Sequence, residues 1–144
     1  MSVAAIMSRP VVTVELDDPL SVVKEIFDNV QFHHLLVVEN GKLFGVISDR
    51  DLFKALSPNL GTAAEKSTDS ATLKKRVHQI MSRNPVCINQ SESVAKALDV
   101  FQSHTISCIP VLDDHQKPVG ILSWRDIFKV LRTDNSVEPD DSVP

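Results

Sequence analysis

The sequence predicts a mixed α/β (α+β) fold made of two tandem β-α-β-β-α units, and three observations lead to this prediction. The first is an internal repeat, which divides the chain into two similar halves. The second is the alternation of apolar, β-branched runs with segments of helical periodicity. The third is an Asn-Gly pair between two apolar runs, a strong signal for a tight hairpin. Hydrophobic residues make up 42% of the 144 residues, which is enough for a buried core.

The repeat is clearest where each copy begins and ends. The tetrapeptide IMSR occupies Ile6–Arg9 and occurs again at Ile80–Arg83. Near the end of each copy, Gly45–Lys54 matches Gly120–Lys129 with six of ten positions identical. We therefore expect a first domain at residues 1–57, a linker at 58–73, a second domain at 74–132 and a tail at 133–144.

The elements of the first copy follow from local signals. Asp18 before Pro19 predicts a helix N-cap followed by proline at the first helical position, and apolar residues then recur at helical spacing. Asn40-Gly41 predicts the turn of a hairpin. The expected elements are a strand at 11–14, a helix ending near Val30, strands at 35–38 and 43–47, and a helix at 49–56.

The second copy repeats this order. Ser93 is the expected N-cap of its first helix, and a further helix from Leu73 to Met81 is expected to lead into the copy. Cys87 and Cys108 lie on expected strands and are interpreted as small buried hydrophobic residues. The expected elements are a strand at 86–88, a helix after Ser93, strands at 109–112 and 119–122, and a helix at 124–131.

Charge and composition exclude several classes of protein. The net charge is −4, and the tail carries four acids and no base, so the remainder is formally neutral. That balance argues against a nucleic-acid-binding protein. No apolar run reaches the ~18 residues of a membrane span, and the start lacks the features of a secretory signal. We expect a soluble, cytoplasmic protein whose tail is disordered.

No catalytic, metal or cofactor motif is recognisable. The chain contains no nucleophile elbow, P-loop or GxGxxG sequence, and its histidines and cysteines lack metal-ligand spacing. The sequence therefore predicts no catalytic residue, no metal ligand and no resident cofactor.

Both copies instead carry a serine and an aspartate three residues apart, where an apolar strand meets a helix. Ser48 and Asp51 form one pair, and Ser123 and Asp126 the other. Residues at this spacing share a helix face and can address one ligand, for which the carboxylate accepts hydrogen bonds from two ribose hydroxyls. Free N–H groups at the helix start favour phosphate. The same pattern also predicts a capping box, and the two roles are compatible.

These features resemble the tandem cystathionine β-synthase (CBS) domain family, whose domain pair is called a Bateman module. The resemblance rests on two copies of a Met-Ser-Arg opening and a Gly-x-x-Ser-x-x-Asp closing motif, and it covers residues 1–132. It implies two domains packed with pseudo-twofold symmetry, with ligand clefts between them. It also implies a stand-alone regulatory protein that pairs into a homodimer.

The resemblance also implies which residues line the two ligand sites. In nucleotide-binding members, the serine and aspartate contact phosphate and ribose, and the adenine lies between the opening loop and the start of the second strand. By position, the remaining contact residues are Arg9, Pro10, Val11, His33, His34 and Leu35 in the first copy, and Asn84, Pro85, Val86, Cys108 and Ile109 in the second.

The two copies differ around these sites. His33 and His34 stand where relatives often carry bases that touch phosphate, and a histidine supplies that charge only when it is protonated. They are equally well interpreted as partly exposed residues at a strand start. Trp124 replaces Asp49 of the first copy. It is interpreted either as a stacking partner for a base or sugar, or as a helix-surface anchor in a dimer interface.

We therefore predict a non-enzymatic sensor that binds an adenine nucleotide (AMP, ADP or ATP) and signals to a protein partner. Two alternatives remain open from the sequence. One is a ligand-free scaffold for dimerisation or protein interaction. The other is binding of S-adenosylmethionine or another adenosyl ligand, which uses the same adenosine contacts without phosphate-binding bases.

Overall fold

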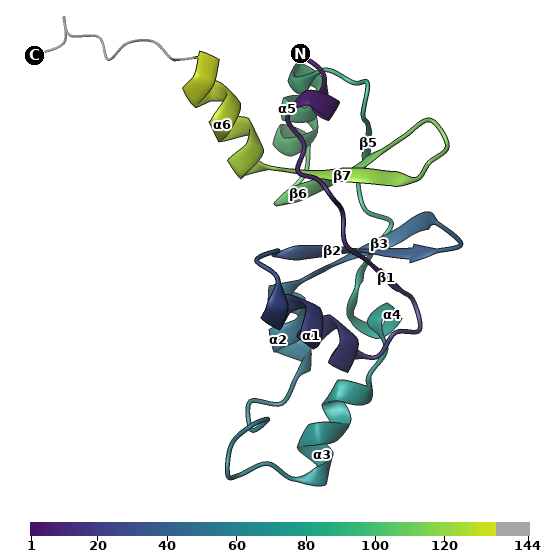
Figure 1. The fold of residues 1–144 in the computed structure, drawn as a ribbon, viewed down its shortest axis with the longest axis vertical. Coiled ribbons are helices and arrows are strands. Elements are labelled where there is room, and N and C mark those ends of the chain that lie inside the picture. The colour runs from purple at the N-terminus through teal and green to yellow at the C-terminus, as the bar shows by residue number, and fades with distance from the viewer. Residues whose placement is uncertain (135–144) are drawn as a thin grey trace, which may run out of the picture. The chain divides into compact units, whose positions relative to one another are not determined.

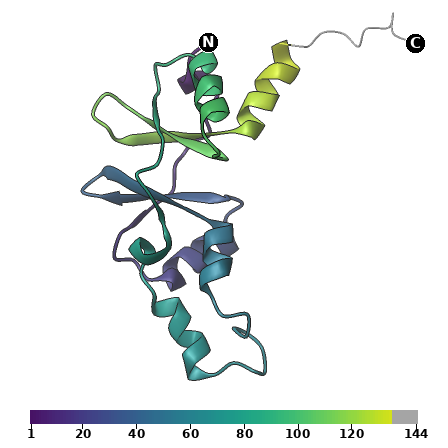
Figure 2. The same ribbon diagram turned by 180° about the vertical axis from the view of Figure 1, so that it is seen from behind.

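The computed structural model describes residues 1–134 and contains the two strand-helix-hairpin-helix copies expected from the sequence (Figure 1 and Figure 2). Two short helical stretches at Val3–Ala5 and Ala71–Lys74 are 3-10 helices. The remaining elements are β1 (Thr13–Glu15), α1 (Leu20–Asn29), β2 (His34–Glu39), β3 (Lys42–Ser48), α2 (Asp49–Ala55), α3 (Ser67–Ser70), α4 (Val77–Ile80), β4 (Ser82–Arg83), β5 (Ile88–Asn89), α5 (Val94–Ser103), β6 (Cys108–Leu112), β7 (Pro118–Ser123) and α6 (Trp124–Asp134).

The described chain forms two compact units, and their limits differ from those of the sequence repeats. Unit 1 contains residues 1–10, 86–115 and the described residues from 119 onward. Unit 2 contains residues 11–85 and 116–118. Residues 1–10, the opening segment of the first copy, thus belong to unit 1, which is otherwise built from the second copy. Residues 74–85, the opening segment of the second copy, belong to unit 2.

Unit 2 holds a four-stranded sheet in the order β1-β2-β3-β4. β1 is parallel to β2, whereas β2 and β3 form an antiparallel hairpin. Asn40 and Gly41 form its two-residue turn with φ values of 52° and 77°. Both values lie in the left-handed region, which Asn and Gly tolerate best, so the hairpin predicted from this pair is confirmed.

Unit 1 holds a three-stranded sheet in the order β5-β6-β7, and β5 runs parallel to β6. Ser93 caps α5 by accepting a hydrogen bond from the Lys96 N–H at 3.1 Å, as expected. The prediction that Cys87 is buried is wrong, because its side chain is exposed while Cys108 is buried. β5 begins only at Ile88, which is the residue that points into the core.

Two further expectations about helix boundaries are also wrong. Pro19, not Asp18, occupies the N-cap position of α1, and it makes no side-chain capping bond. Asp18 instead accepts the Glu15 N–H through its carboxylate, and its carbonyl accepts the Val77 N–H at 2.9 Å. An α-helix through Leu73 and Val77 would need the Val77 N–H to bond the Leu73 carbonyl, but this N–H bonds Asp18. The helix expected from Leu73 to Met81 is therefore interrupted, and only the short α4 follows.

The segment expected to be a linker contains α3 and a 3-10 turn. The Ser57 hydroxyl donates to the Asp69 carboxylate at 2.7 Å, which ties the two ends of this segment together. The predicted disordered tail begins at residue 133, but α6 continues to Asp134. The rest of that tail, residues 135–144, lies outside the described residues.

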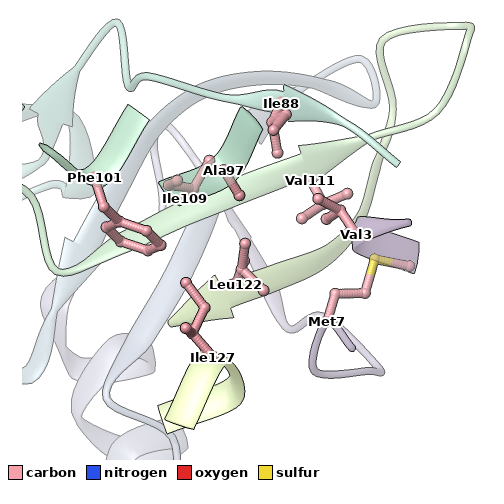
Figure 3. Packing of buried hydrophobic residues seen from close by; sticks show 9 residues of the cluster. All are labelled: Val3, Met7, Ile88, Ala97, Phe101, Ile109, Val111, Leu122 and Ile127. Carbon is pink, nitrogen blue, oxygen red and sulfur yellow. The ribbon is translucent and has the colours of Figure 1, made fainter. Parts of the chain in front are cut away.

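Each unit has a hydrophobic core that includes an opening segment from the other copy. In unit 1, Val3 and Met7 pack against residues of β5–β7, α5 and α6, as Figure 3 shows. In unit 2, Val77 and Met81 take the corresponding places. The remaining buried members are Ile88, Ala97, Phe101, Ile109, Val111, Leu122 and Ile127 in unit 1, and Val14, Leu20, Val23, Leu35, Val37, Ile47 and Leu52 in unit 2.

Equivalent backbone hydrogen bonds hold both opening segments. In unit 1, the Val3 N–H donates to the Glu92 carbonyl at 2.8 Å. In unit 2, the Val77 N–H donates to the carbonyl of Asp18, the residue aligned with Glu92. Further along, Ser8 pairs with Ile121, and Ser82 pairs with Val46 in the same antiparallel sense. The two opening segments are therefore held by the same pattern of backbone hydrogen bonds in both units.

Two glycines make room for these segments. A Cβ atom on Gly45 would lie 2.7 Å from the Met81 sulfur and 2.7 Å from the Ser82 carbonyl oxygen. A Cβ atom on Gly120 would lie 2.5 Å from the Met7 sulfur. The predicted close approach at these glycines is thus a contact with the exchanged segment.

No helix among the described residues is long and apolar enough to cross a membrane.

We predict that Gly45→Ala destabilises the protein by about 2–3 kcal/mol, because the new methyl group meets a backbone carbonyl that cannot move alone. Gly120→Ala should cost less, about 1–2 kcal/mol, since the closest atoms there belong to the flexible Met7 side chain. Urea denaturation measures both values. Lys42→Ala, an exposed change on the same strand as Gly45, is the control and should stay within about 0.5 kcal/mol. Equal stability of all three variants would contradict the packing described.

Candidate functional site

The Ser48–Asp51 pair lies in unit 2, where β3 ends and α2 begins. The Ser48 hydroxyl accepts a hydrogen bond from the Asp51 N–H at 3.0 Å. In return, the Asp51 carboxylate accepts the Ser48 N–H through Oδ2 at 2.9 Å. These reciprocal bonds form the capping box that the spacing predicts, and they fix both side chains at the start of the helix.

The Ser123–Asp126 pair occupies the equivalent place in unit 1, between β7 and α6. The Asp126 Oδ2 atom accepts the Ser123 N–H at 2.9 Å and the Ser123 hydroxyl at 3.2 Å. The other carboxylate oxygen, Oδ1, accepts the hydroxyl of Ser8 at 2.9 Å. Asp126 is only 5% exposed, and it is the only buried polar or charged residue among those described. Asp51, in contrast, is half-buried.

Unit 2 carries a group of titratable side chains beside its pair. His34 lies opposite Ser48 in the antiparallel register of β2 and β3. The preceding residue, His33, places its Nδ1 atom 2.9 Å from Oδ2 of Asp49. Partial desolvation opposes ionisation of Asp49, but the hydrogen bonds from His33 and the Arg50 N–H outweigh it, so the pKa of Asp49 lies below its ordinary value.

His34 is mostly removed from water. This desolvation lowers the pKa of His34 below its ordinary value of 6.5. The charge of Asp49 opposes the shift, that of His33 adds to it, and that of Asp51 again opposes it. In the folded protein, His34 is therefore a weaker source of positive charge near neutral pH than a solvent-exposed histidine.

Unit 1 has no histidine at the corresponding strand start, where Cys108 begins β6. Burial raises the pKa of the Cys108 thiol to about 11, so the thiol stays protonated and uncharged. The Trp124 ring packs on Phe101 with a centroid distance of 4.6 Å and lies 6.0 Å from the Phe128 ring. Trp124 is thus packed against its own unit, while 37% of it remains exposed.

The structure distributes the residues expected around the two ligand sites between both units. Arg9 donates to the Ala4 carbonyl at 3.3 Å, so its guanidinium folds back onto its own segment. Leu35 and Ile109 are fully buried core residues, so neither is exposed for contact with a ligand in this structure. Unit 2 contains Val11, His33, His34, Leu35, Ser48, Asp51, Asn84 and Pro85, and unit 1 contains Arg9, Pro10, Val86, Cys108, Ile109, Ser123 and Asp126.

Two residues near these sites were not identified from the sequence. Asp49 is the hydrogen-bond partner of His33, and Ser8 is a partner of Asp126. Ser8 belongs to the repeated IMSR tetrapeptide, so the signal was present. The repeat does not reveal which aspartate this serine reaches, because both copies contain the same residues.

The comparison with protein families gives two matches. The profile of the CBS domain matches residues 3–58 and 77–133. A CBS domain-containing protein of Dictyostelium discoideum is 34% identical over 131 residues, which are 90% of this chain and 90% of that protein. The chain spans only 22% of the L-aspartate semialdehyde sulfurtransferase of Methanocaldococcus jannaschii, with 30% identity over 126 residues.

Solved structures show the same architecture. The CBS domain pair of protein MJ0100, in complex with 5′-methylthioadenosine and S-adenosyl-L-methionine, matches with a TM-score of 0.75 and 28% identity, over 93% of this chain and 98% of that one. CBSX2 in complex with AMP matches with a TM-score of 0.74 and 21% identity, over 93% of this chain and 98% of that one. These structures confirm the predicted α/β fold of two tandem units.

We predict that Asp126→Ala lowers the free energy of unfolding by about 3 kcal/mol and Asp51→Ala by about 1 kcal/mol. Asp126 accepts three hydrogen bonds in a buried place, whereas Asp51 accepts only one among the described residues. Chemical denaturation measures both losses, and Asp99→Ala on the exposed face of α5 serves as control. Equal losses for the two aspartates would show that the Ser8 contact adds no stability.

We also predict that the stability of the protein falls as the pH drops from 7.5 to 5.5. The folded-state pKa of His34 is lowered, so below pH 6.5 the unfolded chain binds a proton that the folded chain binds less readily. The slope contributed by this one group is at most about 1.4 kcal/mol per pH unit. The lowered pKa of Asp49 adds a separate loss only at more acidic pH.

Thermal unfolding of His34→Asn over this range tests the assignment. The variant should lose most of the pH dependence, whereas His115→Asn, a change at an exposed loop histidine, should retain it. An unchanged slope in His34→Asn would contradict the role of His34.

Proposed function

The chain belongs to the CBS domain family, as its sequence predicted, and from this premise we propose that it is a regulatory module that binds an adenine nucleotide or another adenosine derivative. Binding would alter its interaction with a protein partner. The Ser48–Asp51 and Ser123–Asp126 pairs are the proposed ribose and phosphate contacts. The remaining contact residues carried over from the family stay part of this proposal.

One observation carries the proposal: the same serine-aspartate geometry occurs in both copies at the junction of a sheet and a helix. Each aspartate is held by the N–H of the serine three residues earlier. A carboxylate fixed in this way is already oriented toward a ligand that would donate ribose hydroxyls to it. The same bonds also form a cap at the helix start, and the two roles are compatible.

Two classes of adenosine ligand fit this geometry. The first is an adenine nucleotide, whose phosphate can pair with a protonated imidazole such as that of His34; because the pKa of His34 is lowered, this support applies in mildly acidic solution more than at neutral pH. The second is S-adenosylmethionine or 5′-methylthioadenosine, supported by the 28% identity to a domain pair that holds both compounds. In unit 1 the uncharged Cys108 stands where unit 2 has a histidine, which favours a ligand without phosphate there.

A binding role is favoured over a catalytic one by the state of the serines. The Ser48 hydroxyl accepts a backbone N–H, and the Ser123 hydroxyl faces a carboxylate that is already engaged with Ser8. Neither hydroxyl is paired with a histidine that would activate it as a nucleophile. We therefore propose a non-enzymatic protein. The cytoplasmic location expected from the sequence is a separate part of the proposal.

A homodimer is also part of the proposal. The closing helices α2 and α6 expose Phe53 and Phe128, at 72% and 61% of their surfaces, and α6 also exposes Leu131. Exposed aromatic side chains at equivalent helix positions favour association with a second copy. A dimer formed without any ligand would match the scaffold alternative.

We predict that at least one adenosine compound raises the melting temperature of the full chain. A ligand at a concentration of 100 times its Kd stabilises the folded state by about 2.7 kcal/mol, which corresponds to roughly 8 °C for a chain of this size. Thermal-shift measurements with AMP, ADP, ATP, 5′-methylthioadenosine and S-adenosylmethionine test this prediction. Guanosine monophosphate is the matched control and should have no effect.

The double variant Asp51→Asn, Asp126→Asn should lose the shift, because an amide replaces an acceptor oxygen with a donor at each proposed ribose contact. If no compound stabilises the protein at millimolar concentration, the sensor function is wrong and the scaffold remains. If the double variant responds like the parent, binding occurs elsewhere.

A further inference from the structure

We infer that the two aspartate sites are not equivalent: the Asp51 site is open to an adenosine ligand, and the Asp126 site is closed by the hydroxyl of Ser8. This inference rests on the proposed function and adds which site fills first and which residue decides it. The sequence shows the same serine and aspartate in both copies, so the difference arises from how a third residue is used.

In unit 1, both oxygens of the Asp126 carboxylate are occupied by groups of the protein. Ser8 donates to Oδ1, while the N–H and hydroxyl of Ser123 contact Oδ2. The residue is 5% exposed. A ribose needs at least one carboxylate oxygen that no protein group occupies, and Oδ1 is the oxygen of Asp126 that Ser123 leaves open, so the Ser8 hydroxyl must first be displaced.

In unit 2, the Asp51 carboxylate is held only by the N–H of Ser48, among the contacts of the described residues. Its Oδ2 atom is anchored, and the half-buried side chain leaves its Oδ1 atom free of any protein donor in that part of the chain. The carboxylate is thus already oriented while one oxygen remains available. This is the arrangement that a ligand with ribose hydroxyls requires.

Unit 2 also contains a serine equivalent to Ser8, so the presence or absence of this residue does not explain the difference between the two sites. Ser82 follows Met81 as Ser8 follows Met7, and it pairs with Val46 as Ser8 pairs with Ile121. Both serines are exposed, and the backbone register is the same. Only Ser8 donates its hydroxyl to the aspartate of its unit. At this serine position, the two sites therefore differ in the hydrogen bond that the side chain makes.

Displacing Ser8 costs a hydrogen bond to a charged acceptor, which corresponds to roughly 10- to 100-fold in affinity. We expect the Asp126 site to bind an adenosine ligand more weakly than the Asp51 site by this factor. Ser8 acts here as a specificity-determining residue that selects between two sites of similar sequence.

Isothermal titration calorimetry of the full chain tests the inference, with AMP and 5′-methylthioadenosine as separate probes. The parent should show one tight site per chain. Asp51→Asn should remove that site, and Asp126→Asn should leave it intact. Ser8→Ala should strengthen the second site by roughly 10- to 100-fold, giving two sites per chain. Ser82→Ala is the matched control and should behave like the parent.

Other outcomes separate the two levels of the proposal. Two sites of equal affinity in the parent, loss of the tight site in Asp126→Asn, or identical behaviour of Ser8→Ala and Ser82→Ala would each overturn the inference alone. Absence of binding for both probes in the parent and in Ser8→Ala would overturn the proposed function together with it. The aspartate variants test the ranking of the sites even if Ser8→Ala fails to fold.

Discussion

The contact between a glycine and the methionine of an exchanged segment is the constraint on which both units depend. Gly45 leaves space for Met81 and Gly120 leaves space for Met7. A Cβ atom on either glycine would lie too close to the sulfur atom of the methionine that packs there. These methionines, with Val77 and Val3, complete cores that neither copy of the repeat could close from its own residues. Each compact unit therefore needs residues from both copies.

This packing also determines which side chains reach each site. Ser8 follows Met7 directly, so the seating of the methionine on Gly120 places the serine backbone beside Ile121, from where its hydroxyl reaches the carboxylate of Asp126. The site in unit 1 combines a closing helix from the second copy with an opening segment from the first. A change that loosens the methionine would thus alter the core and the polar contacts of the site together.

The sequence predicted those features that depend on neighbouring residues. The Asn40-Gly41 turn, the Ser93 cap and the Ser48–Asp51 capping box each follow from a local pattern, and the structure contains all three. It did not predict the exchange of opening segments, since Met7 and Met81 both lie in the tetrapeptide IMSR, which does not reveal the unit that each methionine joins. The expected Asp18 cap failed because the carboxylate of Asp18 accepts the Glu15 N–H, while its carbonyl accepts the N–H of Val77, the first residue of α4, which lies far away in the chain.

Because the two copies share the same backbone framework, their differences are concentrated in side chains at equivalent positions. The first residue of α2 is Asp49, which bonds His33, whereas the first residue of α6 is Trp124, which packs on Phe101. One site is therefore flanked by groups that titrate, and the other by an aromatic pair and an uncharged thiol. A change in pH acts on the charge beside Asp51, whereas the Cys108 thiol in unit 1 stays uncharged near neutrality. Both copies contain the acceptor aspartate, as Asp51 and as Asp126. The residues around each aspartate differ, and they determine when its carboxylate can accept a hydrogen bond from a ligand.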